Sequence, residues 1–191
     1  AYASNDKVTV DDKNGTINIK GDVADYTGNQ WSGSAELALS DEVKQSTNVT
    51  LEFTVRNVTN SQSGWPENEW ASQRIAIQMA QGYEGFLFFL PSTETNIFDM
   101  TDNGIGDGNK HKFDANGNWI NELMRSESGV NMRIVREGAN VTLLVQNAED
   151  AWIEIGTVTC ASADAATEIV FYGCGVEWEF SSITVTPNVQ E

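Results

Sequence analysis

The stretch Asn48-Val49-Thr50-Leu51-Glu52-Phe53-Thr54-Val55-Arg56-Asn57-Val58 decides how the rest of the chain is interpreted. Apolar residues occupy every second position, and polar residues separate them. Successive side chains of a β-strand point to opposite faces, so this period of two predicts a long strand with one buried and one solvent-facing side. The stretch therefore indicates a sheet that packs on one side against a core.

Similar patterns recur on both sides of this stretch. They predict further strands within 7–10, 16–20, 34–39, 74–79, 130–135, 141–145, 152–158, 168–172 and 177–186. The continuously apolar run 85–90 predicts a central strand that is buried on both faces. Trp152 and Trp178 lie inside strand patterns and are expected in the core.

The last strand pattern changes parity halfway along. Trp178 and Phe180 share one parity, whereas Ile183 and Val185 share the other. This change predicts a β-bulge near residues 181–182 that turns the second half of the strand over.

The number and shortness of these segments predict an all-β fold. Roughly ten to twelve short strands, with at most one helix within 118–125, favour a β-sandwich (jelly roll) of two antiparallel sheets with few or no helices. A chain of 191 residues that is 40% hydrophobic can bury one substantial core. We therefore expect residues 1–191 to form a single domain, as one module of a larger protein.

The charge of the chain restricts its partners. Its 28 acidic residues outnumber its 11 basic ones, which gives a formal net charge of −17. Such a chain would repel nucleic acid and anionic membrane surfaces. No run approaches the ~18 apolar residues of a membrane-spanning helix. A neutral partner is expected, with no role for nucleic acid or membrane.

The sequence Gly64-Trp65-Pro66-Glu67-Asn68-Glu69-Trp70 is the leading candidate for a binding site. It places two indoles in a polar, turn-rich loop between two strand patterns. Pyranose rings expose C–H groups that pack flat against an indole, so Trp65 and Trp70 could form a platform for a neutral sugar. The competing interpretation is that these tryptophans fold back as lids over an edge of the sandwich.

Other residues could complete such a site. Arg56, Arg74 and Gln78 are close to this loop in sequence and belong to the non-core parity of their strands, so they could hydrogen-bond sugar hydroxyls. The aromatic residues Tyr83, Trp31 and Trp119 are secondary candidates, because each lies beside Gly or Asn in an expected loop.

The segment 99–110 offers oxygen ligands for a structural calcium ion. It contains Asp99, Asp102, Asn103 and Asp107 among glycines. Lys110 occupies the twelfth position, where an EF-hand loop requires a bidentate Glu. A plain polar loop is the alternative interpretation, and we expect no other cofactor.

The sequence leaves open whether the two cysteines, Cys160 and Cys174, form a disulfide. If residues 152–158 and 168–172 formed a simple hairpin, its register would separate the two cysteines by more than the ~7 Å that a disulfide allows between Cα atoms. This reasoning favours two buried thiols over a disulfide.

The second half of the chain resembles the concanavalin A-like superfamily of lectins and glucanases. The resemblance rests on the hairpin Val130-Asn-Met-Arg-Ile-Val-Arg-Glu-Gly-Ala-Asn-Val-Thr-Leu-Leu-Val, on the strand of Trp152, and on the closing strand that ends Phe180-Ser-Ser-Ile-Thr-Val. It implies a jelly roll, a sugar site on a concave sheet or its rim, and often a structural calcium. It also suggests a carbohydrate-binding module of a secreted bacterial polysaccharide-degrading protein, located extracellularly or at the cell surface.

Catalysis is the less favoured hypothesis. Retaining glycosidases place two carboxyl groups roughly 5–5.5 Å apart, and glucanases of this superfamily carry them in a Glu-x-Asp-x-x-Glu run that is absent here. Glu67 with Glu69 and Glu177 with Glu179 are the nearest substitutes. His111, the single histidine, lies between two lysines without a nucleophile motif nearby.

The sequence therefore predicts a binding protein and not an enzyme. The expected activity is non-catalytic binding of a neutral plant polysaccharide, a glucan such as starch, β-glucan or xyloglucan, or an oligosaccharide derived from one. The alternatives are a structural or adhesive spacer domain of a surface protein and, with less support, a β-sandwich glycoside hydrolase.

Overall fold

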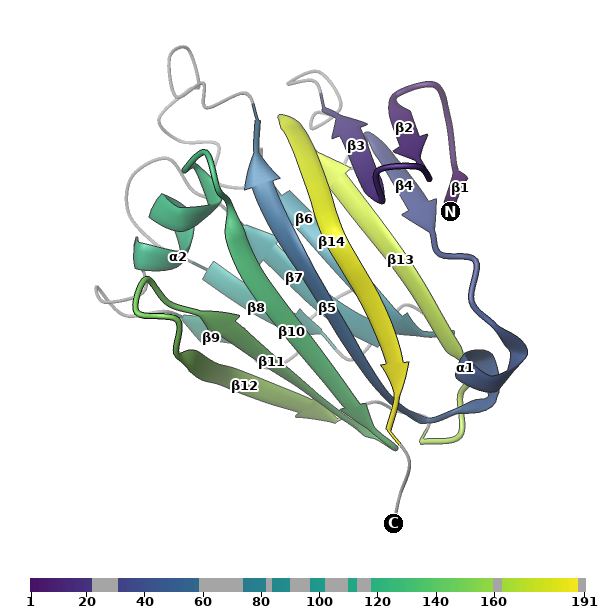
Figure 1. Ribbon diagram of the computed structural model, residues 1–191. Helices are drawn as coiled ribbons and strands as arrows, with labels where there is room; N and C mark the ends of the chain where they lie inside the picture. Colours follow the sequence, from purple (N-terminus) through teal and green to yellow (C-terminus); the bar gives the residue numbers. More distant parts are fainter. Residues whose placement is uncertain are drawn as a thin grey trace.

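The computed structural model describes residues 1–21, 31–58, 74–81, 84–89, 97–101, 110–112, 118–159 and 163–188. Within these ranges the fold is nearly all β, as predicted, with two short helices (Figure 1). The helices are α1 (Asp41–Gln45) and α2 (Asn118–Met124). The strands are β1 (Tyr2–Ala3), β2 (Val8–Asp11), β3 (Thr16–Lys20), β4 (Gly33–Glu36), β5 (Asn48–Asn57), β6 (Arg74–Ala80), β7 (Glu84–Phe89), β8 (Ile97–Thr101), β9 (Lys110–Lys112), β10 (Val130–Glu137), β11 (Asn140–Gln146), β12 (Trp152–Thr159), β13 (Thr167–Cys174) and β14 (Glu177–Pro187).

The strands form the two antiparallel sheets of a β-sandwich, which confirms the predicted fold class. Sheet A has the order β1-β4-β13-β6-β7-β8-β9, and sheet B has the order β12-β11-β10-β5-β14-β3-β2. Neighbouring strands within each sheet run antiparallel. Figure 1 shows the strands of sheet B in front of those of sheet A.

The core lies between the two sheets and is built by the alternation seen in the sequence. In β5, Val49, Leu51, Phe53 and Val55 are buried, and the residues between them are half-buried. Phe53 of sheet B meets Phe171 of sheet A edge-on, with ring centroids 5.3 Å apart. This aromatic contact joins the two layers at the centre of the sandwich.

The predicted core position of Trp178 is confirmed. Its side chain is fully buried, and its indole Nε1 donates a hydrogen bond to the carbonyl oxygen of Cys174 over 3.0 Å. A buried indole needs a partner for its N–H, and the chain supplies one four residues earlier.

The predicted β-bulge in the last strand is also confirmed. The register of β14 against β5 shifts between Ser181 and Thr184, and Ser182 adopts a positive φ of 52°. The bulge turns Ile183 and Val185 towards the core side, where both pack against the core cluster.

The helices correspond only in part to the sequence prediction. The structure confirms a helix within 118–125, where α2 buries Ile120 and Met124 against the core. The five-residue helix α1 was not predicted, although Ser40 caps it through an Oγ that accepts a hydrogen bond from the Val43 amide over 3.3 Å. A single turn carries too little periodicity to be detected in the sequence.

The hairpin assumed between residues 152–158 and 168–172 is wrong. β12 is the edge strand of sheet B, whereas β13 lies inside sheet A between β4 and β6. The register argument against a disulfide therefore does not apply. Cys174 is fully buried, as expected of it, and Cys160 lies outside the described residues.

The prediction that Trp152 is a core residue is also wrong. Trp152 and Glu154 lie opposite Gln146 and Leu144 of β11, which are the outward positions beside the buried Leu143 and Val145, so both are on the outer face. Trp152 is half-buried on the outer face of sheet B, and the Cζ atom of Arg133 lies 4.2 Å from the centre of its ring. At this edge strand the position opposite the buried Val145 is taken by Ile153, which is itself 40% exposed, so no fully buried position was open to the tryptophan.

Candidate functional site

The structure describes only some of the residues predicted to form the binding site. Trp65, Trp70 and Tyr83 lie outside the described residues. Of Arg74 the structure gives the backbone position, at the start of β6 and opposite Cys174 of β13. The side chains of Arg56, Gln78, Trp31 and Trp119 are described, so these four can be compared.

Two of these four residues meet on the outer face of sheet A through a third, Tyr172. The rings of Trp31 and Tyr172 have centroids 5.5 Å apart and are tilted by 46°. The hydroxyl of Tyr172 donates a hydrogen bond to Oε1 of Gln78 over 2.9 Å. We call these three residues the aromatic cluster. It joins two aromatic surfaces to one amide on a single sheet face.

The local sequence explains why Tyr172 points outward. In β13, Ile169 and Phe171 belong to the core, so the alternation sends Val170 and Tyr172 to the other face. The strand partners of Tyr172 are Ala76 on β6 and Ser34 on β4. These small neighbours give the tyrosine ring room beside the Trp31 ring.

Gln78 differs from the solvent-facing amide that the sequence predicted. Only 5% of its surface is exposed, although it lies on the outer face of β6 between the core residues Ile77 and Met79. Burying an amide is costly unless it is hydrogen-bonded, and the Tyr172 hydroxyl meets that requirement at Oε1. Gln78 therefore fixes the position of the Tyr172 hydroxyl.

The outer face of sheet A continues towards its edge. Glu36 of β4 lies between Val170 of β13 and Tyr2 of β1 in the register of the sheet. Glu36 is exposed, and Tyr2 is 67% exposed. Three aromatic side chains, Tyr2, Trp31 and Tyr172, thus belong to this end of sheet A.

Arg56 and Trp119 do not join the aromatic cluster. Arg56 points away from the core on β5 of sheet B, where its Nη2 pairs with the Glu179 carboxylate over 3.1 Å. Its Nη1 donates to the carbonyl oxygen of Glu127 over 3.4 Å. Trp119 lies on α2 and packs half-buried against the core. The structure therefore separates Arg56 and Gln78, which the sequence had grouped, onto opposite outer faces.

The sequence reasoning missed Tyr172 as a candidate. It lies in the apolar run Ile169-Val170-Phe171-Tyr172, which predicts a strand but no binding residue. The signal that could have found it is parity, because the two inward residues Ile169 and Phe171 force their neighbours onto the outer face.

The structure leaves the calcium prediction open. Asp102, Asn103 and Asp107 lie outside the described residues, and Asp99 is placed only by its backbone in β8. In the part of the chain that is described, no three His, Cys, Asp or Glu side chains gather closely enough to hold a metal ion. Within the same ranges, neither helix is long and apolar enough to cross a membrane.

Comparison with known proteins shows a fold but no family. The sequence matches no family model and no curated protein. The structure is similar to the exoplasmic/lumenal domain of VIP36 in its Ca²⁺/Man3GlcNAc-bound form, with a TM-score of 0.59 at 9% identity over 97% of this chain and 83% of that one.

Two other solved structures match to a similar degree. A functionally unknown protein from Saccharomyces cerevisiae gives a TM-score of 0.58 at 12% identity, over 99% of this chain and 97% of that one. The alginate lyase from Klebsiella pneumoniae gives 0.58 at 16% identity, over 100% and 87%. At such low identity these matches establish a shared β-sandwich fold.

Proposed function

We propose that this protein binds a neutral polysaccharide, without cleaving it, on the outer face of sheet A. The observation that carries the proposal is the aromatic cluster, in which the Trp31 and Tyr172 rings lie 5.5 Å apart and the Tyr172 hydroxyl is hydrogen-bonded to the buried amide of Gln78. Aromatic faces take up the C–H side of a pyranose ring, and adjacent polar groups fix its hydroxyls.

The partner class follows from charge. A net charge of −17 disfavours polyanionic glycans at long range, whereas a neutral glycan meets no such barrier. Glucans such as starch, β-glucan and xyloglucan are the ligands to test first. The loop tryptophans Trp65 and Trp70 remain proposed contributors to the same binding activity.

The structural neighbours support a sugar ligand in general terms and leave the reaction open. One neighbour is a glycan-bound lumenal domain, and another is a lyase. The proposal of a non-catalytic role rests on the acidic residues. Glu179 is held in an ion pair with Arg56, and the Glu-x-Asp-x-x-Glu run is absent. The exoplasmic or lumenal location of the VIP36 domain supports a secreted or surface-exposed module.

Calorimetric titration with soluble starch, β-glucan, xyloglucan and xylan tests this function. The wild type should bind at least one of them saturably, and Trp31→Ala and Tyr172→Ala should each weaken that binding about tenfold or more, since tenfold corresponds to about 1.4 kcal/mol. Thr184→Ala, at an exposed position of sheet B, is the matched control and should bind normally.

Three results would change the conclusion. Binding that is lost in a Trp65→Ala, Trp70→Ala double variant but kept in both cluster variants would move the site to the loop. Absence of binding to every glycan would favour a spacer domain. Release of reducing sugar on long incubation would favour a hydrolase and direct attention to Glu67, Glu69, Glu177 and Glu179.

A further inference from the structure

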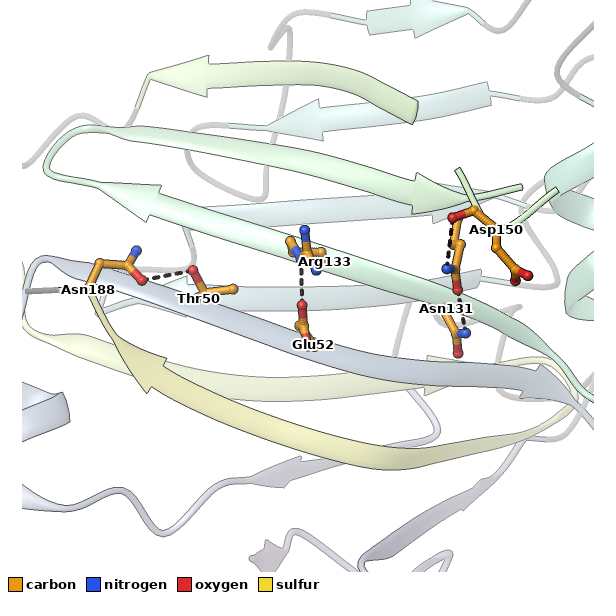
Figure 2. Close-up of polar contacts among 7 residues, drawn as sticks. Thr50, Glu52, Asn131, Arg133, Asp150 and Asn188 are labelled. Atoms are coloured by element: carbon orange, nitrogen blue, oxygen red, sulfur yellow. Dashed lines mark hydrogen bonds and ion pairs between the residues drawn. The ribbon is translucent and has the colours of Figure 1, made fainter. Parts of the chain in front are cut away.

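The outer face of sheet B carries a second ordered group of polar side chains, which runs across the strands (Figure 2). Thr54 of β5 donates through Oγ1 to Oδ1 of Asn131 on β10 over 2.7 Å, and Asn131 donates through Nδ2 to Oε1 of Gln146 on β11 over 2.8 Å. Gln146 in turn donates through Nε2 to the carbonyl oxygen of Asp150 over 3.1 Å. We call Thr54, Asn131 and Gln146 the amide ladder.

A second row runs parallel to the amide ladder, two residues further along the strands. Arg133 of β10 donates through Nε to Oε1 of Glu52 on β5 over 2.5 Å. The same guanidinium lies over the indole of Trp152 on β12, with Cζ 4.2 Å from the ring centre. The guanidinium therefore links the Glu52 carboxylate of β5 to the indole of Trp152, which lies opposite Gln146 in the register of the amide ladder.

We propose that these two rows are a second saccharide-binding surface, which takes a neutral oligosaccharide lying across β5, β10, β11 and β12. Neighbouring strands are about 4.8 Å apart, comparable to the length of one pyranose unit, so successive sugar units would meet successive strands. The proposal rests on the proposed function for the class of ligand, but it concerns different residues on the opposite side of the sandwich.

The neutrality of the expected ligand follows from local charge. Glu52 compensates Arg133 within the row, and the amide ladder carries no charge. On the same face Arg56 is likewise compensated by Glu179, and Glu154 adds a further carboxylate, so a polyanion would gain little. Hydroxyl groups suit this surface because they both donate and accept hydrogen bonds.

The amide ladder still has capacity for hydrogen bonds to a ligand. An amide offers two N–H donors and two lone pairs on oxygen. Asn131, which is exposed, spends one donor and one lone pair on the ladder. Its side chain is also already held in one rotamer by Thr54 and Gln146, so binding would cost less conformational entropy than binding by a free surface amide.

The indole of Trp152 is the apolar part of this surface. The guanidinium of Arg133 lies over one face of the ring, and Trp152 is only half-buried at the edge strand of sheet B. An indole held by a guanidinium has a fixed orientation, which suits stacking against a sugar ring. The two rows thus combine fixed hydrogen-bonding groups with one aromatic surface.

The test is a nuclear magnetic resonance titration of the ¹⁵N-labelled chain with maltohexaose, cellohexaose and xylohexaose. It follows the side-chain amide signals of Asn131 and Gln146 and the indole N–H signals of Trp152 and Trp31. The measurement is repeated on Tyr172→Ala, on Asn131→Ala and on the same-face control Thr186→Ala.

We expect the signals of Asn131, Gln146 and Trp152 on sheet B to shift saturably with one of these sugars. In Tyr172→Ala the shifts should persist, with less than about a twofold change in affinity. Asn131→Ala should weaken the affinity about tenfold (~1.4 kcal/mol), whereas Thr186→Ala should leave it unchanged. Shifts confined to Trp31, with sheet B signals unmoved, would overturn this inference and leave the proposed function standing. An absence of shifts at both surfaces with all three sugars, together with no binding in the calorimetric titration, would overturn both.

Discussion

The two outer faces of the sandwich place polar groups in different ways. On sheet A, the Gln78 amide is 5% exposed and accepts a hydrogen bond from the hydroxyl of Tyr172. On sheet B, the Asn131 amide is exposed and hydrogen-bonds to other polar side chains. Both residues occupy outward positions of their strands, so the difference lies in what covers them. Removing the hydrogen-bond partner of a buried polar group costs free energy of folding, whereas on an exposed face water can replace the partner.

The largest expected effect is that of Tyr172→Ala on stability. The substitution removes a half-buried ring and the donor to a buried amide oxygen, so it should lower the free energy of unfolding by about 2–4 kcal/mol. Urea denaturation of this variant beside Thr184→Ala, which should change stability by less than about 0.5 kcal/mol, measures the contrast. If the two substitutions lowered the free energy of unfolding equally, the burial of Gln78 would not make the outer face of sheet A more sensitive to substitution than that of sheet B.

The more conservative Tyr172→Phe isolates the hydrogen bond from the ring. Phenylalanine keeps the contact with Trp31 but leaves Oε1 of Gln78 without this donor, so we expect a loss of about 1 kcal/mol. Sugar binding should be weakened less than by Tyr172→Ala, because the stacking surface remains. A variant as stable as the wild type would show that solvent reaches Gln78. The amides of Gln78 and Asn131 would then not differ in their access to water.

On sheet B, the coupling between Arg133 and Glu52 should be small. A double-mutant cycle with Arg133→Met and Glu52→Gln should give about 0.2–1 kcal/mol, as is usual for ion pairs with roughly a third of each side chain exposed. The coupling should fall in 1 M NaCl, where the Debye length is only about 3 Å. A coupling well above this range that is insensitive to salt would place the pair in a buried environment like that of Gln78.

The sequence predicts the fold better than it predicts the site, for physical reasons that particular residues illustrate. The parity of β5 and the parity change of β14 follow from local alternation, so the strands and the bulge at Ser182 could be read directly. The assignment of β12 and β13 to different sheets depends on long-range pairing that no local pattern encodes.

The candidate sites depend on which outward residues meet, and this again is long-range information. Trp31 and Gln78 are 47 positions apart in sequence, yet they share Tyr172 as a neighbour because β13 lies between β4 and β6. Arg56 and Gln78 are closer in sequence, yet their strands belong to different sheets. Trp152 was expected in the core because it lies inside a strand pattern, but the pairing of β12 with β11 places it opposite Gln146 on the outer face.

The smallest expected effect is that of Thr54→Val in the amide ladder. Valine is nearly isosteric with threonine and favours a strand, and the exposed Asn131 oxygen can accept a hydrogen bond from water in place of the lost hydroxyl. Stability should therefore change by less than about 0.5 kcal/mol. The side-chain amide of Asn131 should nevertheless become more mobile, which ¹⁵N relaxation of its NH₂ group would detect. If its order parameter stayed unchanged, Gln146 alone would fix the amide, and the ladder would extend only from β10 to β11 instead of across three strands.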